Sequence, residues 1–218
     1  MKAAGFAVAD AAGKQALAMG LVECLGDPDP LLRDGIAYEA LQHWMRAGDF
    51  DAAFLRRVRD ALFARLDGPD PQGVSRPFAA LVLAEVARTD RVAPWMQPAE
   101  REAMLARATA YLGTLQDYRG FEPGIGWRHG VAHGADWLLQ LSLNPALEAA
   151  QLRRILDVVA LQAVPASGHA YVFGESDRLV QPVAYIARRG VLVEADWQAW
   201  LASLVARLGP MPAAGDGA

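Results

Sequence analysis

The chain has one cysteine, Cys24, and only two lysines beside 19 arginines. A single thiol excludes a disulfide within the chain and agrees with a reducing compartment, so we expect a cytoplasmic protein. The net charge is −4, and no basic stripe alternates with aromatic residues. Because nucleic-acid binding needs such a basic surface, we predict no nucleic-acid partner.

Long apolar runs are also missing. Asp10 and Lys14 interrupt the moderately apolar first 20 residues, which therefore fit a first amphipathic helix better than a membrane span. We expect no membrane association. Alternation typical of β-strands is nearly absent, and its one weak candidate, Ala170–Phe173, is too short to build a sheet.

Most segments instead repeat their apolar residues with the 3.6-residue period of an α-helix. Phe54, Val58 and Leu62 form one such stripe. Short breaks rich in Gly, Pro and Asp separate the stripes at 26–30, 67–73, 93–98 and 120–126. We predict an all-α fold of about nine helices, with a single domain over residues 1–208 and a flexible tail over 209–218.

Two of the breaks resemble each other. LGDPDP begins at Leu25, and LDGPDP begins 41 positions later, at Leu66. A period near 41 residues is typical of HEAT and armadillo repeats, which stack antiparallel helix pairs. This pattern predicts a short HEAT-like α-solenoid. The other interpretation is a generic helix bundle in which two turns share Pro-Asp-Pro.

The stretch Asp117–Trp137 carries the densest group of side chains capable of chemistry. A loop rich in Gly and Pro leads into His129, His133 and Asp136. On a helix beginning near Trp127, at roughly 100° per residue, these three side chains fall within about 60° of one another. The clearest apolar residues of that helix lie on the opposite side, so we expect the three polar side chains to line a groove. Gly130 and Gly134 lie to the side, where they would let a neighbouring helix approach closely.

The spacing H-x-x-x-H suits a metal site as well as a metal-free one. It places two imidazoles on one helical face, as in zinc metalloproteases, but Gly130 replaces the glutamate that serves those enzymes as general base. We predict no cofactor, with a divalent metal at His129, His133 and Asp136 as the minor alternative. A third ligand would come from Asp136, His169, Glu175 or Asp177. Alternatively, the histidines hydrogen-bond the glycine loop and are structural.

A second polar group, Glu175, Asp177 and Arg178, precedes an amphipathic run. Acidic residues are favoured in the first turn of a helix, and this preference alone explains the two carboxylates. They also offer the nearest carboxylate partners for the histidines after Asp136.

Four short motifs stand out in the sequence: the run Arg119-Gly-Phe-x-x-Gly-x-Gly-Trp127-x-His129-x-x-x-His133-x-x-Asp136, with Arg33-Asp34, Ser75-Arg76 and Glu175–Leu179. Together they resemble an uncharacterised bacterial family. That family is a domain of unknown function with the pattern R-G-[FY]-x-x-G-x-G-W-x-H-x-x-x-H-x-x-D. The resemblance covers roughly residues 20 to 190, and it implies a helical, HEAT-like domain without an established activity. Pro77 departs from it, where a small polar residue is expected. The positions that match its motifs are Arg76, Arg119, Trp127, His129, His133, Asp136, Glu175 and Arg178.

Two functional hypotheses remain open. In the first, a groove binds a small anionic or apolar-faced ligand, and His129 or His133 acts as general acid or base, oriented by Asp136 or Glu175. The residues expected to contact the ligand there are Arg76, Arg119, Trp127, Trp137, Glu175 and Arg178. No serine, cysteine or lysine nearby is a convincing nucleophile. In the second hypothesis, the chain is a scaffold for a protein or peptide partner, and the histidine cluster is structural.

Overall fold

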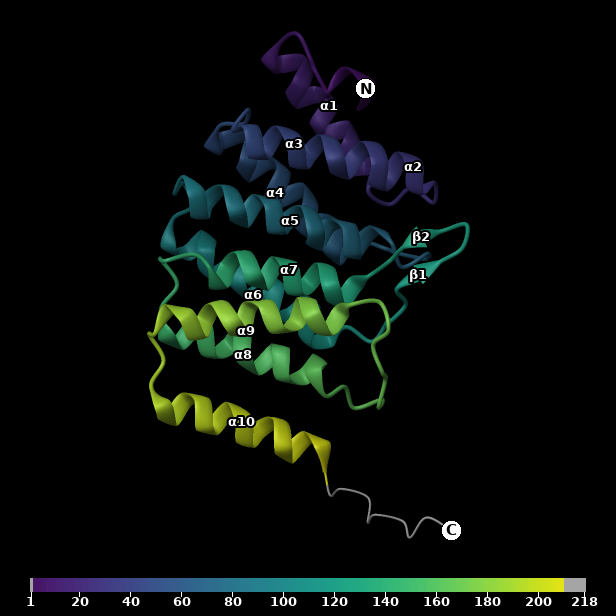
Figure 1. Ribbon diagram of the computed structural model, residues 1–218. Helices are drawn as coiled ribbons and strands as arrows, with labels where there is room; N and C mark the ends of the chain where they lie inside the picture. Colours follow the sequence, from purple (N-terminus) through teal and green to yellow (C-terminus); the bar gives the residue numbers. More distant parts are fainter. Residues whose placement is uncertain (1, 210–218) are drawn as a thin grey trace.

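The computed structural model describes residues 2–209 and shows an almost entirely helical chain (Figure 1). Within these residues there are nine helices when the continuous stretch Pro30–Ala47 is counted once, which confirms the predicted all-α fold. That stretch comprises α2 (Pro30–Leu32), a π-helical segment (Arg33–Tyr38) and α3 (Glu39–Ala47). The other helices are α1 (Ala11–Cys24), α4 (Ala52–Asp67), α5 (Ser75–Val92), α6 (Pro98–Thr114), α7 (Gly130–Ser142), α8 (Ala149–Ala163), α9 (Glu175–Arg189) and α10 (Glu194–Leu208).

The helices form two layers. In Figure 1, α3, α5, α7 and α9 lie side by side in a front layer, with α4, α6 and α8 behind them and α1 and α10 toward the two ends. Each of the three middle helices at the back packs against the front helix that follows it in the chain. This stack of helix pairs is the arrangement that the 41-residue repeat predicts.

The apolar stripes meet between the layers. Phe54, Val58 and Leu62 of α4 are buried, as are Val82 and Val86 of α5, in one continuous core. Burying one face of each helix against the other layer is what imposes the 3.6-residue period on the sequence. At the end of the stack, α10 has no fully buried side chain.

Both Pro-Asp-Pro turns stand at the start of a front-layer helix. Asp29 caps α2 by accepting a hydrogen bond from the Leu31 backbone N–H, and Pro30 occupies the first turn, where no N–H is needed. The carboxylate of Asp70 accepts the backbone N–H groups of three consecutive residues at the start of α5, Val74, Ser75 and Arg76. The two turns therefore perform the same task in equivalent places. Pro77 lies in the first turn of α5.

The one strand ladder among residues 2–209 is not where the sequence suggested. Ala170–Phe173 forms a loop, whereas β1 (Phe121–Glu122) and β2 (Gly126–Trp127) pair as a short antiparallel hairpin. Gly124 and Gly126 have φ of +85° and +82°, a conformation open to glycine at little cost, which closes the turn. Strands of two residues are too short to show a periodicity, so this stretch resembles a plain loop in the sequence.

No helix within residues 2–209 is long and apolar enough to cross a membrane. The tail predicted over 209–218 lies, apart from Gly209, outside the described residues.

Candidate functional site

His129 lies just before α7 and not on it. The helix begins at Gly130, three residues after the predicted start at Trp127, and His129 precedes it with a left-handed φ of +54°. The backbone N–H groups of Arg128 and His129 donate to the carbonyls of Gly120 and Arg119, at 2.9 and 3.2 Å, and hold the chain beside β1. The predicted helical wheel therefore applies to His133 and Asp136 but not to His129.

The imidazole of His129 is held in one orientation. Its Nε2 lies 3.1 Å from the carbonyl oxygen of Phe173, which can only accept, so Nε2 carries the proton in this bond. A Glu175 carboxylate oxygen lies 3.6 Å from the same nitrogen, and the other accepts the Phe173 N–H at 2.9 Å. The ring also stacks on Trp127, with centroids 4.6 Å apart.

These contacts determine which ring nitrogen of His129 can still accept a hydrogen bond or a proton. Burial lowers the pKa of His129, against the opposing effect of the Glu175 carboxylate, so the ring is neutral at pH 7. With the proton on Nε2, the lone pair of the neutral ring is on Nδ1, which accepts no hydrogen bond among residues 2–209. His129 is therefore an oriented imidazole with an available acceptor.

His133 presents the complementary tautomer. Its Nδ1 lies 3.2 Å from the carbonyl oxygen of Pro77 on α5 and donates to it, which leaves the lone pair on Nε2. Only 7% of the residue is exposed, and burial lowers the pKa of His133 to about 3. Its ring centroid is 5.8 Å from that of His129. The two neighbouring histidine rings thus each keep one acceptor nitrogen.

Asp136 and Arg178 join α7 to α9 on the same face. A single guanidinium nitrogen of Arg178, Nη1, donates to both carboxylate oxygens of Asp136, at 2.8 and 2.9 Å. Burial raises the pKa of Asp136, while the charge of Arg178 acts in the opposite direction. The Nε and Nη2 atoms of Arg178 form no hydrogen bond within the described part of the chain, and half of the side chain is exposed. Arg178 therefore keeps donors for a ligand.

Polar side chains of α3 and α5 extend this face, and their role was not predicted from the sequence. Gln42 donates to the Tyr38 hydroxyl and, at 3.1 Å, to Glu85, whose carboxylate also accepts from Arg46 at 2.9 Å. Burial raises the pKa of Tyr38 to about 12, so its hydroxyl stays protonated at neutral pH. No motif marks these residues, because two helices that are separate in the sequence, α3 with the segment before it and α5, bring them together.

Arg33, which follows the first Pro-Asp-Pro turn, links the hairpin to the stack of helices. Its side chain is completely buried and donates to the carbonyl oxygens of Ile125, at 2.8 Å, and Asp27, at 3.0 Å. The guanidinium carbon also lies 4.8 Å from the centre of the Phe78 ring. Arg33 opens the π-helical segment, and such segments are frequent near functional sites.

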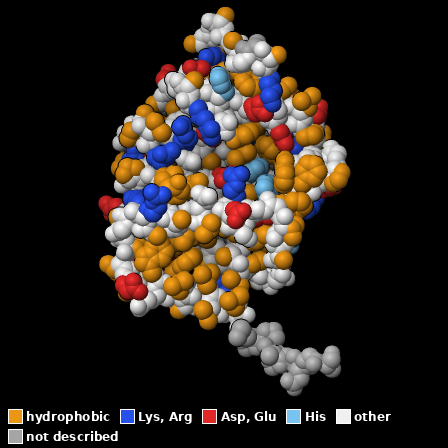
Figure 2. All heavy atoms as spheres, in the orientation of Figure 1, with side chains coloured by type: hydrophobic (Ala, Val, Ile, Leu, Met, Phe, Trp, Pro, Cys, Tyr) orange, Lys and Arg blue, Asp and Glu red, His pale blue; other side chains and the backbone are white. Residues whose placement is uncertain are grey.

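Figure 2 shows the result as a surface. Histidine side chains (pale blue) and a basic side chain lie in a hollow at the centre of the front face, another histidine lies near the top, and apolar side chains border the hollow on the right. Three aromatic residues of and near the hairpin remain exposed, Phe121 at 47%, Trp127 at 38% and Phe173 at 41%. Trp127 contacts the other two edge to face, with centroids 5.2 and 5.9 Å away. We call the group formed by Trp127, His129, His133, Asp136, Glu175 and Arg178 the central face.

Three predicted site residues lie outside the central face. Trp137 is completely buried in the core, with its ring centroid 6.5 Å from that of Phe63. Arg76 donates to the Gly68 carbonyl oxygen at 2.9 Å, and Arg119 pairs with its neighbour Asp117. The structure therefore does not bring these three side chains to the histidines.

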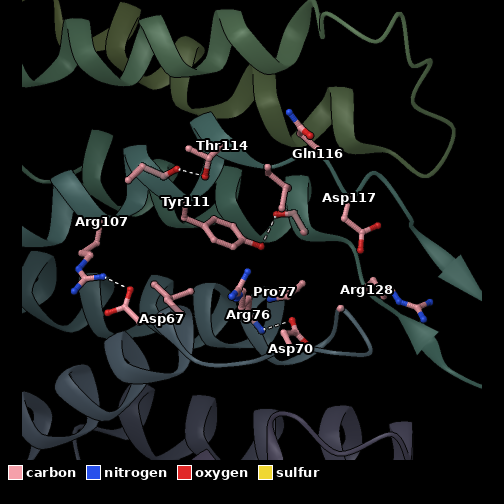
Figure 3. Close-up of a pocket in the computed structure, with 15 residues that line it drawn as sticks. Asp67, Asp70, Arg76, Pro77, Arg107, Tyr111, Thr114, Gln116, Asp117 and Arg128 are labelled. Carbon is pink, nitrogen blue, oxygen red and sulfur yellow. Dashed lines mark hydrogen bonds and ion pairs between the residues drawn. The ribbon is translucent and has the colours of Figure 1, made fainter.

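Arg76 lines a separate cavity of about 410 Å³ (Figure 3). Tyr111, Asp117 and Arg128 also line this cavity, as does Pro77, whose carbonyl oxygen accepts the hydrogen bond of His133. Its charged groups are largely paired within the protein: Arg107 with Asp67, and Asp70 with the start of α5. None of the five cavities described, with volumes of about 340 to 520 Å³, is lined by His129 or His133.

Within residues 2–209, no group of three or more His, Cys, Asp and Glu side chains is arranged to hold a metal ion. Nε2 of His129 faces the Phe173 carbonyl, and Arg178 donates to both oxygens of Asp136. A metal at His129, His133 and Asp136, the minor alternative, would have to bind Nδ1 of His129 and Nε2 of His133, and would compete with Arg178 for Asp136.

Residues 62–214 match the protein family described as "Protein of unknown function (DUF2785)". The chain belongs to this family. Comparisons with curated proteins and with solved structures gave no match. The matched segment contains every predicted site residue from Arg76 to Arg178, whereas Arg33 and Tyr38 precede it. The family description assigns no activity, so the function of this DUF2785 protein has to be argued from its own geometry.

Proposed function

We propose that the central face binds a small organic anion with a planar apolar part. The observation that carries the proposal is the set of unused groups that meet there. Nδ1 of His129 and Nε2 of His133 are acceptors, Nε and Nη2 of Arg178 are donors, and Trp127 is an exposed aromatic surface. Ligand sites commonly combine an apolar wall with a few oriented polar groups.

Each residue has a distinct task in this proposal. The free edge of Arg178 binds the anionic group of the ligand, because a guanidinium suits bidentate contact with a carboxylate. Trp127 packs against the planar part. The two histidine nitrogens accept hydrogen bonds from donors on the ligand. Buried Glu175 orients His129 indirectly, through the Phe173 backbone and its own charge.

His129 also has the properties of a general base. Its ring is neutral at pH 7, its Nε2–H is fixed by a carbonyl, and its Nδ1 is free to take a proton. A ligand with an acidic proton beside Nδ1 would be activated in this way. A reducing, cytoplasmic location belongs to the same proposal, since Cys24 is a free thiol.

Benzoate is a suitable probe, because it combines a carboxylate with a planar apolar ring. We expect saturable binding by calorimetry, and about tenfold weaker binding to Arg178→Met, which loses a charge-assisted contact. Benzyl alcohol, without the charge, should bind weakly and equally to both proteins. Arg153→Met is the matched control, since Arg153 is similarly half-exposed and ion-paired, to Asp196 on α10. Equal benzoate affinity in the Arg178 and Arg153 variants would reject the proposal.

A protein or peptide partner is the second candidate, and one observation favours it. The exposed aromatic side chains of Phe121, Trp127 and Phe173 form a patch of the kind enriched at protein interfaces. On this account, Phe121→Ala weakens association with the partner and leaves benzoate binding unchanged. Loss of benzoate binding in Phe121→Ala would show that the two surfaces are one site.

A further inference from the structure

A cavity of about 430 Å³ lies where α3 and α5 end, away from the hairpin and the central face. Its walls come from Met45–Gly48, from the start of α4 and from the end of α5 with the loop that follows. Gly48 ends α3 in a left-handed conformation, with φ of +78°, and turns the chain toward α4. The volume is within the range of sites for small molecules.

The apolar wall of this cavity is held in place by hydrogen bonds. The buried carboxylate of Asp90 accepts the backbone N–H groups of Trp95, at 2.9 Å, and Met96, at 2.7 Å. The indole N–H of Trp95 donates to Thr89 Oγ1 at 3.0 Å, and Arg56 donates to the Trp95 carbonyl oxygen at 3.0 Å. A cavity whose wall is fixed in this way loses little entropy when a ligand enters.

Few polar side-chain groups remain available at the wall. Thr89 both accepts from Trp95 and donates to the Val86 carbonyl oxygen, so it is satisfied. Arg46 uses two nitrogens for the carboxylate of Glu85. Among residues 2–209, the guanidinium of Arg88 has neither a hydrogen bond nor an ion pair, and Arg88 is one of the residues that line the cavity.

The surroundings of Arg88 carry an excess of positive charge. The pKa of Arg91 is lowered by burial and then by the charge of Arg88, which places the two guanidiniums near each other. The two acids of the same helix are already bound, Glu85 by Arg46 and Gln42 and Asp90 by Arg101. In Figure 2, basic side chains gather on the left of the face, over the ends of the front helices. The net charge of the whole chain is −4, so the charge of this region has the opposite sign.

We infer that this cavity binds a small amphipathic monoanion, with an aliphatic or aromatic body inside and an acidic group on Arg88. The apolar wall, built largely from Phe50, Leu55 and Trp95, accounts for the body. The unpartnered guanidinium accounts for the charge, because an anion there is paired without displacing a bond of the protein. A cation would meet only Arg46 and Arg88 at this wall. The cavity shares no lining residue with the six residues of the central face.

Octanoate is the probe that tests this inference, with 1-octanol as its uncharged counterpart. Titration of the full chain, followed by NMR, should shift the Trp95 indole N–H and the Gly48 amide with one saturating curve. Arg88→Ala should weaken octanoate binding about tenfold and leave the weaker binding of 1-octanol unchanged. Because the Arg88 guanidinium takes part in no hydrogen bond or ion pair of the described residues, the variant should keep the thermal transition of the wild type.

Arg57→Ala is the matched control. Arg57 is also free of ion pairs among the described residues, but it lies on α4 over Phe54 and lines none of the described cavities. Its replacement should leave octanoate affinity unchanged. Equal affinities in the Arg88 and Arg57 variants, or wild-type shifts that saturate elsewhere and spare Trp95 and Gly48, would overturn the inference. Absence of saturable octanoate binding would overturn the inference as well. If Arg88→Ala fails to fold, the positions of the NMR shifts on the wild type decide whether octanoate binds in this cavity.

Discussion

Nδ1 of His133, on α7, lies 3.2 Å from the carbonyl oxygen of Pro77, on α5. The bond links the two central helices of the front layer and fixes the tautomer of His133. It also joins the central face to the cavity of Figure 3, because Pro77 lines that cavity. The neutral imidazole is thus both a structural link and, through Nε2, part of the proposed binding site.

The buried His133 should make the stability of the protein depend on pH. Burial lowers its pKa from the ordinary 6.5 to about 3, so between these values the unfolded chain binds a proton that the folded chain excludes. Stability is unaffected above pH 6.5 and falls as the pH drops toward 3, with a slope approaching about 1.4 kcal/mol per pH unit.

His133→Gln tests this dependence, since its amide retains a donor for Pro77 and does not titrate. Urea unfolding measured between pH 7 and pH 4 should give a shallower decline of the unfolding free energy for the variant than for the wild type. Parallel curves for the two proteins would mean that His133 is charged in the folded state or accessible to water.

The helical stack was predictable because burial imposes a local pattern. Phe54, Val58 and Leu62 are buried on one face of α4, and their spacing alone reveals that face. The close approach predicted for Gly134 is also confirmed, since a Cβ there would lie 2.9 Å from the side chain of Leu112 on α6.

The site was predictable only in part, because distant segments set its details. The left-handed His129 depends on the carbonyls of Arg119 and Gly120, which no helical wheel contains. The partner of Asp136 is Arg178, 42 positions away. Trp137 belongs to the core because Phe63, from an earlier helix pair, packs against it. The spacing of residues in the sequence was enough to locate the stretch Asp117–Trp137. Which of its side chains lie together depends on tertiary contacts, which the spacing does not reveal.

Gly134 should tolerate no side chain. Alanine there would press on Leu112 and on the Tyr111 ring, 3.0 Å away, so Gly134→Ala should lower the unfolding free energy by about 1–2 kcal/mol despite the better helix propensity of alanine. Gly20, inside α1, has nothing within 4 Å of the corresponding position, and Gly20→Ala should raise the unfolding free energy by up to about 1 kcal/mol. Chemical unfolding measures both changes. If the two substitutions change the unfolding free energy in opposite directions, the close packing at Gly134 is supported, whereas a stabilising Gly134→Ala contradicts it.

The left-handed backbone of His129 should favour glycine over alanine. At φ of +54°, an alanine is less favourable than glycine by about 1 kcal/mol, because its Cβ crowds the following carbonyl. Both substitutions remove the same imidazole, so His129→Gly should unfold at a higher urea concentration than His129→Ala. The reverse order would show that residue 129 adopts an ordinary helical conformation in solution.

The central claim is that the face around Trp127 and Arg178 binds an organic anion, and the position of bound benzoate tests it most directly. NMR of the full chain with benzoate should show nuclear Overhauser contacts between the benzoate ring and the indole protons of Trp127. The same contacts should vanish in Arg178→Met at equal benzoate concentration. Contacts confined to Trp95, or contacts to Trp127 that persist undiminished without the Arg178 guanidinium, would contradict the account.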